Sequence, residues 1–138
     1  MIEYQVHRSG AHLNLEEVID LYRASTLGER RPVDDPARMR QMLDNANLVV
    51  LAYDGDLLVG ISRSLSDYSF ATYLSDLAVR LSHQRQGIGK EMIRRTQAAG
   101  GSAKVILLAA PAAVNYYPHI GMSAHHSCWT LDPGAELL

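Results

Sequence analysis

Apolar and polar residues alternate along the first segment of the chain and then repeat at helical spacing. The opening IEYQVH alternates in polarity as a half-buried strand does, and it ends at the turn signal Ser9-Gly10. In the next segment, NLEEVIDLYRAS, apolar residues recur every three to four positions behind Asn14, a good N-cap. After the polar loop GERRPVDD, Asp35-Pro36 predicts the start of a second helix over PARMRQMLDNA.

After Asn47 the pattern changes to longer apolar runs that include β-branched residues. LVVLAY and LLVGISRSL flank Asp54-Gly55, a dipeptide suited to a tight turn, so the two runs are predicted to pair antiparallel. TYLSDLAVRL predicts a further strand, and a helix is expected from about Gly87 to Ala99. The remaining elements are a buried strand, KVILLAA, a short helix, AAVNYYPHI, that ends near Gly121, and a final strand, SCWTL.

This order of elements predicts the fold class and the number of domains. It favours an α/β (α+β) fold with one central, mostly antiparallel mixed sheet of about six to seven strands, flanked by about four helices. The chain has 138 residues, of which 47% are hydrophobic. Because that length suits one well-packed core and is short for two, residues 1–138 are predicted to form a single domain.

Composition excludes several function classes. The formal net charge of −2 provides no bulk attraction to nucleic acid or to an anionic membrane. No apolar run approaches the roughly 20 residues of a membrane helix, and the N-terminus lacks the pattern of a secretion signal. The single cysteine, Cys128, cannot form an internal disulfide. We therefore expect a soluble, cytoplasmic protein with no nucleic-acid or membrane partner.

The stretch HQRQGIGKEMIRR places two glycines where an apolar strand gives way to a basic helix. A glycine-rich turn at a helix N-terminus is a good anion site, because the helix presents unpaired backbone N–H groups and the positive end of its dipole. Two familiar phosphate loops do not fit, since Met92 stands where a dinucleotide fingerprint needs glycine and Glu91 where a P-loop needs Ser or Thr. The alternative is a tight turn with close helix packing.

The surroundings of these glycines resemble a known family. Gln84-Arg85-Gln86-Gly87-Ile88-Gly89, between a strand and a helix, resembles the pyrophosphate loop Q/R-x-x-G-x-G/A of the GNAT superfamily of acetyl-CoA-dependent N-acetyltransferases. Near the C-terminus, Tyr116 to Met122 resembles that family's F/Y-Y-x-x-x-G-F pattern, with Met122 in place of the usual Phe. The resemblance covers nearly the whole chain in its order of elements. It implies the GNAT fold and acetyl-CoA as the acetyl donor, with no metal.

The resemblance also implies roles for individual residues. Tyr117 corresponds to the family's tyrosine, which acts as the general acid on the departing thiolate. Its alternative is a buried packing tyrosine. The residues implied to contact acetyl-CoA are the strand segment Leu77, Ala78 and Val79, the loop residues Gln84, Arg85, Gln86, Gly87, Ile88, Gly89 and Lys90, and the helix residues Asn115 and Tyr116.

Acetyl transfer to an amine also requires that the amine lose a proton. An alkylamine with a pKa of about 10.4 is only about one part in two thousand neutral at pH 7. Asp76 is the candidate base, because it is a carboxylate inside an otherwise apolar strand beside the presumed thioester segment. A structural ion pair with Arg63 or Arg80 is the alternative, and a water held by Tyr73 or Ser75 is another. The family often carries a bulge in this strand, so alternation does not decide which face Asp76 occupies.

The identity of the acceptor is the least readable part of the sequence. Acidic residues around Asp34-Asp35 and at Asp67 favour a small cationic amine, although a solvated loop carboxylate is the default for Asp67. The stretches RRP and NANLVVLAYDGDLLVGISRSLSD resemble small bacterial GNAT proteins related to plant chloroplast-type enzymes, some of which acetylate arylalkylamines. A non-catalytic CoA-binding or regulatory module of the same fold is the alternative function. Dimerisation is common in the family, so a homodimer is compatible with the sequence.

A metal site is not expected near the C-terminus. His125, His126 and Cys128 are ligand types close together in the sequence, but they lack a fourth partner and would point to alternate faces of a strand.

Overall fold

The computed structural model describes residues 1–138 and separates into two compact units, Met1–Leu108 and Ala109–Leu138, each described by itself. The elements of the first unit are β1 (Ile2–His7), α1 (Leu15–Ala24), α2 (Pro36–Asp44), β2 (Leu48–Asp54), β3 (Leu57–Ser66), β4 (Ala71–Val79), α3 (Ile88–Ala99) and β5 (Lys104–Ile106), with 3-10 turns at Leu27–Arg30 and Leu81–His83. The second unit contains a 3-10 turn, Pro111–Ala113, and α4 (Tyr116–His119).

The strands of the first unit form one sheet in the order β1-β2-β3-β4-β5. Neighbouring strands are antiparallel except β4 and β5, which are parallel. In the turn between β2 and β3, Gly55 has a φ of 60°, which glycine adopts without strain. The structure thus confirms the hairpin at Asp54-Gly55 and the mostly antiparallel mixed sheet.

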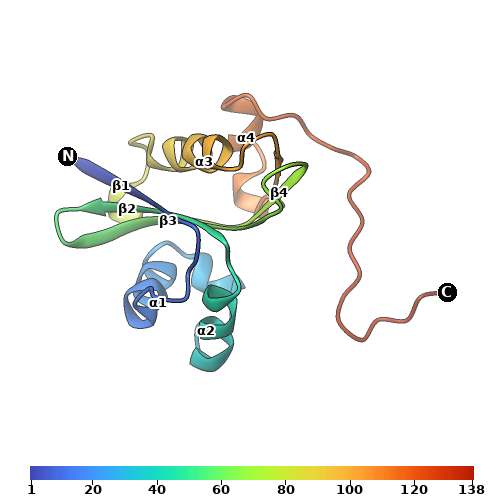
Figure 1. The fold of residues 1–138 in the computed structure, drawn as a ribbon, viewed down its shortest axis with the longest axis horizontal. Coiled ribbons are helices and arrows are strands. Elements are labelled where there is room, and N and C mark those ends of the chain that lie inside the picture. Colours follow the sequence, from blue (N-terminus) through green and yellow to red (C-terminus); the bar gives the residue numbers. More distant parts are fainter. The chain divides into compact units, whose positions relative to one another are not determined.

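Helices cover both faces of this sheet, with α1 and α2 on one face and α3 on the other (Figure 1). This arrangement explains why consecutive residues of β2 are apolar, because its alternate side chains are buried in two different cores. Val49 and Leu51 pack with the α1–α2 side, whereas Val50 and Ala52 pack with Ile88 of α3. Burial of each large apolar side chain contributes about 1.5–3 kcal/mol, so both faces stabilise the central strands.

The two N-terminal helices begin where the sequence predicts. The side chain of Asn14 accepts a hydrogen bond from the backbone N–H of Glu17 at 3.0 Å and caps α1. Asp35 caps α2 by accepting the backbone N–H of Arg38 at 3.2 Å. None of the helices has both the length and the apolar character needed to cross a membrane.

The C-terminal part of the chain departs from the prediction. The sheet has five strands rather than six to seven, because SCWTL, residues 127–131, forms no strand and continues the chain beyond α4 without regular structure (Figure 1). Strand propensity depends on a paired neighbour, and Trp129 in this segment is 89% exposed. The run predicted as a strand over 104–110 pairs only at Lys104–Ile106, and the helix predicted over 112–120 is limited to Tyr116–His119 after a 3-10 turn.

Candidate functional site

The start of α3 presents backbone N–H groups without a capping side chain. Gly87 occupies the N-cap position, and the first backbone hydrogen bond of the helix runs from the N–H of Glu91 to the carbonyl of Gly87 at 3.0 Å. The N–H groups that precede Glu91 therefore lack an acceptor within the helix. Ile88 is 2% exposed and packs in the core beneath α3, which fixes the loop against the sheet. This arrangement suits a bound anion.

Conformation, not close packing, accounts for the glycine at position 87. Gly87 has a φ of 81°, in the left-handed region, and a Cβ added there would meet no atom within 4 Å. A side chain would therefore strain the backbone without striking a neighbour. Arg85, two residues earlier, also has a positive φ of 64°. The packing explanation offered by the sequence does not hold for Gly87.

The side chains of the loop divide into one that anchors it and several that are exposed. The Nε2 of Gln84 donates a hydrogen bond to the carbonyl of Val79 at 3.0 Å, so the loop is tied to the end of β4. Arg85, Gln86 and Lys90 are exposed. Neither Arg85 nor Lys90 forms an ion pair within residues 1–108. Two positive charges thus lie free beside the N-terminus of α3.

The last residues of β4 form an open strand edge. β5 pairs with β4 only from Ala71 to Tyr73, so Leu77 to Val79 have a neighbour strand on one side alone. The N–H of Arg80 donates to β3, to the carbonyl of Val59 at 2.8 Å. By the alternation of an antiparallel ladder, Ala78 also faces β3, whereas the backbone groups of Leu77 and Val79 face the open side. An extended amide chain can pair with such an edge.

Asp76 lies just before this edge, next to a bulge. Arg63 of β3 is opposite Asp76, but the next residue, Ser64, is opposite Leu74, so Ser75 has no partner. The bulge that the resemblance implies for this strand is therefore confirmed. It turns the Asp76 side chain toward the α1–α2 face, where the side chain is fully buried.

Four donors surround the Asp76 carboxylate, the most distant being the hydroxyl of Ser75, which donates to Oδ1 at 3.3 Å. Its Oδ2 accepts the hydroxyl of Tyr22 and the Nε of Arg63, each at 2.6 Å, and its Oδ1 accepts the Nε of Arg31 at 2.6 Å. Burial alone would raise the pKa of Asp76, but the charge of Arg63, with its hydrogen bond and that of Tyr22, outweighs burial and lowers the pKa. The carboxylate is thus ionised and fully engaged.

These contacts favour the ion-pair interpretation of Asp76 over the base. A general base needs an accessible lone pair and a pKa near the working pH, and Asp76 has neither. Of the two predicted partners, Arg63 is the one found. Arg80 instead pairs with Asp20 at 2.9 Å.

Neither Tyr22 nor Arg31 is predicted from the sequence as a member of this cluster. Tyr22 lies at one of the helically spaced apolar positions of NLEEVIDLYRAS, and its hydroxyl gives no signal in a periodicity pattern. Arg31 belongs to a polar loop whose composition indicates solvent exposure. Both residues lie far from Asp76 in the sequence, separated by 54 and 45 positions respectively, so no local spacing connects them.

The predicted residues near the C-terminus belong to the second unit. Gly121, with a φ of 97°, ends α4 in a Schellman motif, in which the N–H of Met122 reaches the carbonyl of Tyr117 at 3.0 Å. The rings of Tyr116 and Tyr117 lie edge to face with centroids 5.3 Å apart. Burial, and to a smaller extent Tyr116, raises the pKa of Tyr117, so its hydroxyl remains a proton donor at neutral pH. Asn115 is exposed and makes no capping bond.

The carboxylates that suggested a cationic acceptor each have a local partner. Asp34 pairs with Arg23 at 2.8 Å, and Asp35 caps α2. Asp67 accepts backbone N–H groups from the turn between β3 and β4, at 2.8 to 3.1 Å, and these bonds lower its pKa. These three carboxylates therefore stabilise local structure through an ion pair, a helix cap and a turn.

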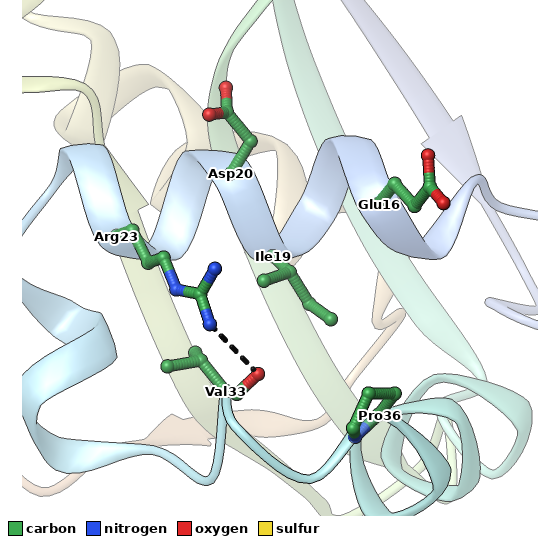
Figure 2. Close-up of a pocket in the computed structure, with 6 residues that line it drawn as sticks. All are labelled: Glu16, Ile19, Asp20, Arg23, Val33 and Pro36. Atoms are coloured by element: carbon green, nitrogen blue, oxygen red, sulfur yellow. Dashed lines mark hydrogen bonds between the residues drawn. The ribbon is translucent and has the colours of Figure 1, made fainter.

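A surface cavity of about 270 Å³ lies between α1 and the residues that lead into α2 (Figure 2). Its lining residues are Glu16, Ile19, Asp20, Arg23, Val33 and Pro36. Figure 2 shows that Arg23 closes one side of it, by a hydrogen bond to the carbonyl of Val33 at 3.4 Å. No group of three or more His, Cys, Asp or Glu side chains able to hold a metal ion is present in the chain.

Comparison with known proteins places these features in context. The family model described as an acetyltransferase (GNAT) domain matches residues 24–128. The chain is 30% identical over 111 residues to an uncharacterised ycf52-like N-acetyltransferase of Prochlorococcus marinus; the match covers 75% of this chain and 56% of the relative. The chain thus spans little more than half the length of that relative.

Solved structures share the fold. A GNAT-family acetyltransferase from Streptococcus pneumoniae superposes with a TM-score of 0.75 at 26% identity, covering 96% of this chain and 100% of that one. An aminoglycoside N-acetyltransferase in complex with CoA superposes with a TM-score of 0.71 over 97% of this chain and 95% of that one. The identity of this second pair is 14%, so the likeness concerns the fold alone.

Proposed function

Because the chain belongs to the acetyltransferase (GNAT) family, we propose that it transfers an acetyl group from acetyl-CoA to a primary amine. The observation that carries this proposal is the uncapped N-terminus of α3 beside the open edge of β4. An anion site and a free strand edge, joined by Gln84, suit a ligand that has a pyrophosphate at one end and amide groups along its arm. Residues 1–138 are proposed to form one acetyltransferase domain.

The residues proposed to hold acetyl-CoA contribute backbone groups and two charges. The backbone N–H groups from Gly87 onward receive the pyrophosphate, while Arg85 and Lys90 supply positive charge beside it. Leu77 offers its open backbone groups to the pantetheine arm. The full proposed set is Leu77, Ala78, Val79, Gln84, Arg85, Gln86, Gly87, Ile88, Gly89, Lys90, Asn115 and Tyr116.

Tyr117 is proposed as the general acid. The amine nitrogen attacks the acetyl carbon to give a tetrahedral oxyanion. When this intermediate collapses, the carbon–sulfur bond breaks and the Tyr117 hydroxyl gives its proton to the departing thiolate. The raised pKa of Tyr117 supports this role, because it keeps the donor protonated at neutral pH. Backbone N–H groups are suited to stabilise the intermediate oxyanion.

Water is proposed to take the proton that the amine loses. The contacts of Asp76 support this choice, because its buried carboxylate is held ionised by two arginines and has no exposed lone pair. The proton passed to water then restores Tyr117 after the thiol leaves.

The acceptor is proposed to be a small primary amine in the cytoplasm. The partners found for Asp34, Asp35 and Asp67 remove the charge argument for a cationic acceptor, so the class of amine depends on experiment. A homodimer is compatible with this proposal, and no nucleic-acid or membrane partner is expected.

The test is acetyl transfer, measured as the release of CoA thiol. Acetyl-CoA is supplied with 2-phenylethylamine, spermidine, an aminoglycoside or a lysine-containing peptide. We expect release with at least one amine, and loss of that release in Tyr117→Phe while acetyl-CoA still raises the unfolding temperature. Stabilisation by acetyl-CoA without turnover of any amine would instead favour the non-catalytic CoA-binding module.

A further inference from the structure

The guanidinium of Arg31 joins the loop between α1 and α2 to the bulge of β4. Its Nε donates to Oδ1 of Asp76 at 2.6 Å, and its Nη2 donates to the backbone carbonyl of Ser75 at 2.8 Å. The remaining nitrogen, Nη1, donates to the carbonyl of Arg30 at 2.8 Å within the loop itself. All three nitrogens are therefore engaged, in a fork geometry that lysine cannot reproduce.

Arg31 donates a hydrogen bond to the carbonyl of Ser75 on the edge of β4 that β5 leaves unpaired. β5 pairs with β4 as far as Tyr73, and the next carbonyl on that side, from Ser75, is taken by Arg31. At the other end of the edge, the carbonyl of Val79 is taken by Gln84. Leu77, between them, keeps both its N–H and its carbonyl open. Arg31 and Gln84 thus delimit the open part of β4.

The same loop reaches the surface cavity at its other end. Val33 and Asp34 are both held by Arg23, and Val33 lines the cavity (Figure 2). The loop is therefore fixed at two points, by Arg31 on β4 and by Arg23 on α1. Val33 is also buried in the core on the α1–α2 side, so loss of Arg31 specifically removes the hydrogen bonds that join the loop to the bulge.

Arg31 is not needed to keep Asp76 paired. Without it, Asp76 still accepts hydrogen bonds from Tyr22 and Arg63 at 2.6 Å each. The Arg31 side chain is also 24% exposed, whereas that of Arg63 is 8% exposed. The two arginines therefore differ in role: Arg63 neutralises the buried carboxylate, and Arg31 connects it to the loop.

We propose that Arg31 is a positioning residue that fixes the bulge of β4, and with it the register in which Leu77 meets the pantetheine arm. This inference rests on the proposed function, since it takes β4 as the strand that carries the acetyl donor. A misplacement of about 1 Å costs on the order of a hundredfold in rate. The pyrophosphate loop is separate from this contact, so affinity for acetyl-CoA should change little.

The test compares Arg31→Gln with Arg30→Gln, a matched control. Arg30 carries the same charge one residue away, is exposed, and uses only its backbone carbonyl in the hydrogen bonds described above. Hydrogen–deuterium exchange is followed in peptides that cover 27–35 and 74–79. In Arg31→Gln we expect exchange about tenfold faster in both peptides, with α3 unchanged, and near wild-type exchange in Arg30→Gln.

Kinetics with the best amine of the panel test the consequence for the reaction. We expect kcat of Arg31→Gln to fall about tenfold to a hundredfold, while KM for acetyl-CoA changes by less than about threefold. Arg31→Lys, which keeps the charge but not the fork, should behave like Arg31→Gln.

Three results would overturn the inference. Equal exchange in Arg31→Gln and Arg30→Gln would show that the Arg31 side chain does not hold the loop to the bulge of β4. Faster exchange with an unchanged kcat would show that Arg31 does not position groups needed for the reaction. Wild-type kcat in Arg31→Lys would show that the positive charge is sufficient without the fork of hydrogen bonds. If the wild-type chain turns over no amine, the proposed function fails by itself, and exchange alone decides whether Arg31 ties the loop to β4.

Discussion

Replacement of Gly87 by alanine tests whether the start of α3 binds an anion. The added Cβ meets no atom within 4 Å, so the variant suffers only the strain of placing alanine at a φ of 81°. That strain amounts to about 1 kcal/mol, or about 4 °C in unfolding temperature for a chain of this size. Gly55→Ala is a matched control, since Gly55 has a φ of 60° and also nothing within 4 Å. Both variants should therefore lose the same stability.

The two variants should differ when acetyl-CoA is added. At a hundredfold its Kd, the ligand adds about 2.7 kcal/mol to the free energy of unfolding, in the wild type and in Gly55→Ala alike. In Gly87→Ala the methyl group extends into open space at the N-cap of α3, where the proposed site would receive the pyrophosphate. If Kd rises tenfold, the same concentration adds only about 1.4 kcal/mol.

Thermal unfolding with and without acetyl-CoA, at one fixed concentration, measures this difference directly. If the start of α3 binds the anion, the two variants should have equal unfolding temperatures without ligand. Acetyl-CoA should then raise the unfolding temperature of Gly87→Ala less than that of Gly55→Ala. A full shift in Gly87→Ala would show that the loop contributes no anion contact. The glycine would then serve only the turn that leads into α3.

Further predictions concern Tyr117 and Asp76. Tyr117→Phe should lower kcat by about a hundredfold or more without reducing the stabilisation by acetyl-CoA, and unchanged turnover would exclude the general acid. Because burial raises the pKa of Tyr117, a pH–rate profile should show no Tyr117-dependent loss of kcat below about pH 10. Asp76→Asn should destabilise the chain by about 3–5 kcal/mol in urea unfolding, since two arginines lose their buried partner; a loss below about 1 kcal/mol would contradict the cluster. The pKa of Asp76 is lowered on folding, so its stabilisation is complete above the ordinary value of 3.8 and is lost as the pH falls through the folded-state pKa. Acid unfolding of the wild type and of Asp76→Asn should therefore converge only below that pH.

Elements determined by local pattern were predicted from the sequence. The caps at Asn14 and Asp35, the hairpin at Asp54-Gly55 and the helix that follows Gly87 all depend on residues within one turn of each other. The apolar runs also located β2, β3 and β4. The segment SCWTL shows the limit of this approach, because alternation describes a strand only where another strand is available to pair with it.

The cluster around Asp76 depends on contacts that no local pattern contains. Arg63 was a foreseeable partner, because it lies opposite Asp76 in the hairpin of β3 and β4. Tyr22 and Arg31 reach the same carboxylate from a helix and a loop on the other side of the core. The sequence identified the unusual residue, a carboxylate in an apolar strand, but only the fold shows that its lone pairs are already used.

The distribution of charge explains how a chain with a net charge of −2 can hold an anionic donor. Several of its carboxylates are used by the fold: Asp76 pairs with two arginines, Asp34 with a third, and Asp35 caps a helix. Two of the basic residues that form no ion pair, Arg85 and Lys90, lie at the N-terminus of α3 beside its uncapped N–H groups. Ion pairs largely cancel at a distance, whereas free charges act within about 10 Å at 0.1 M salt. The unpaired charges of Arg85 and Lys90 are therefore opposite in sign to the net charge, and they are carried by side chains that form no ion pair within the fold.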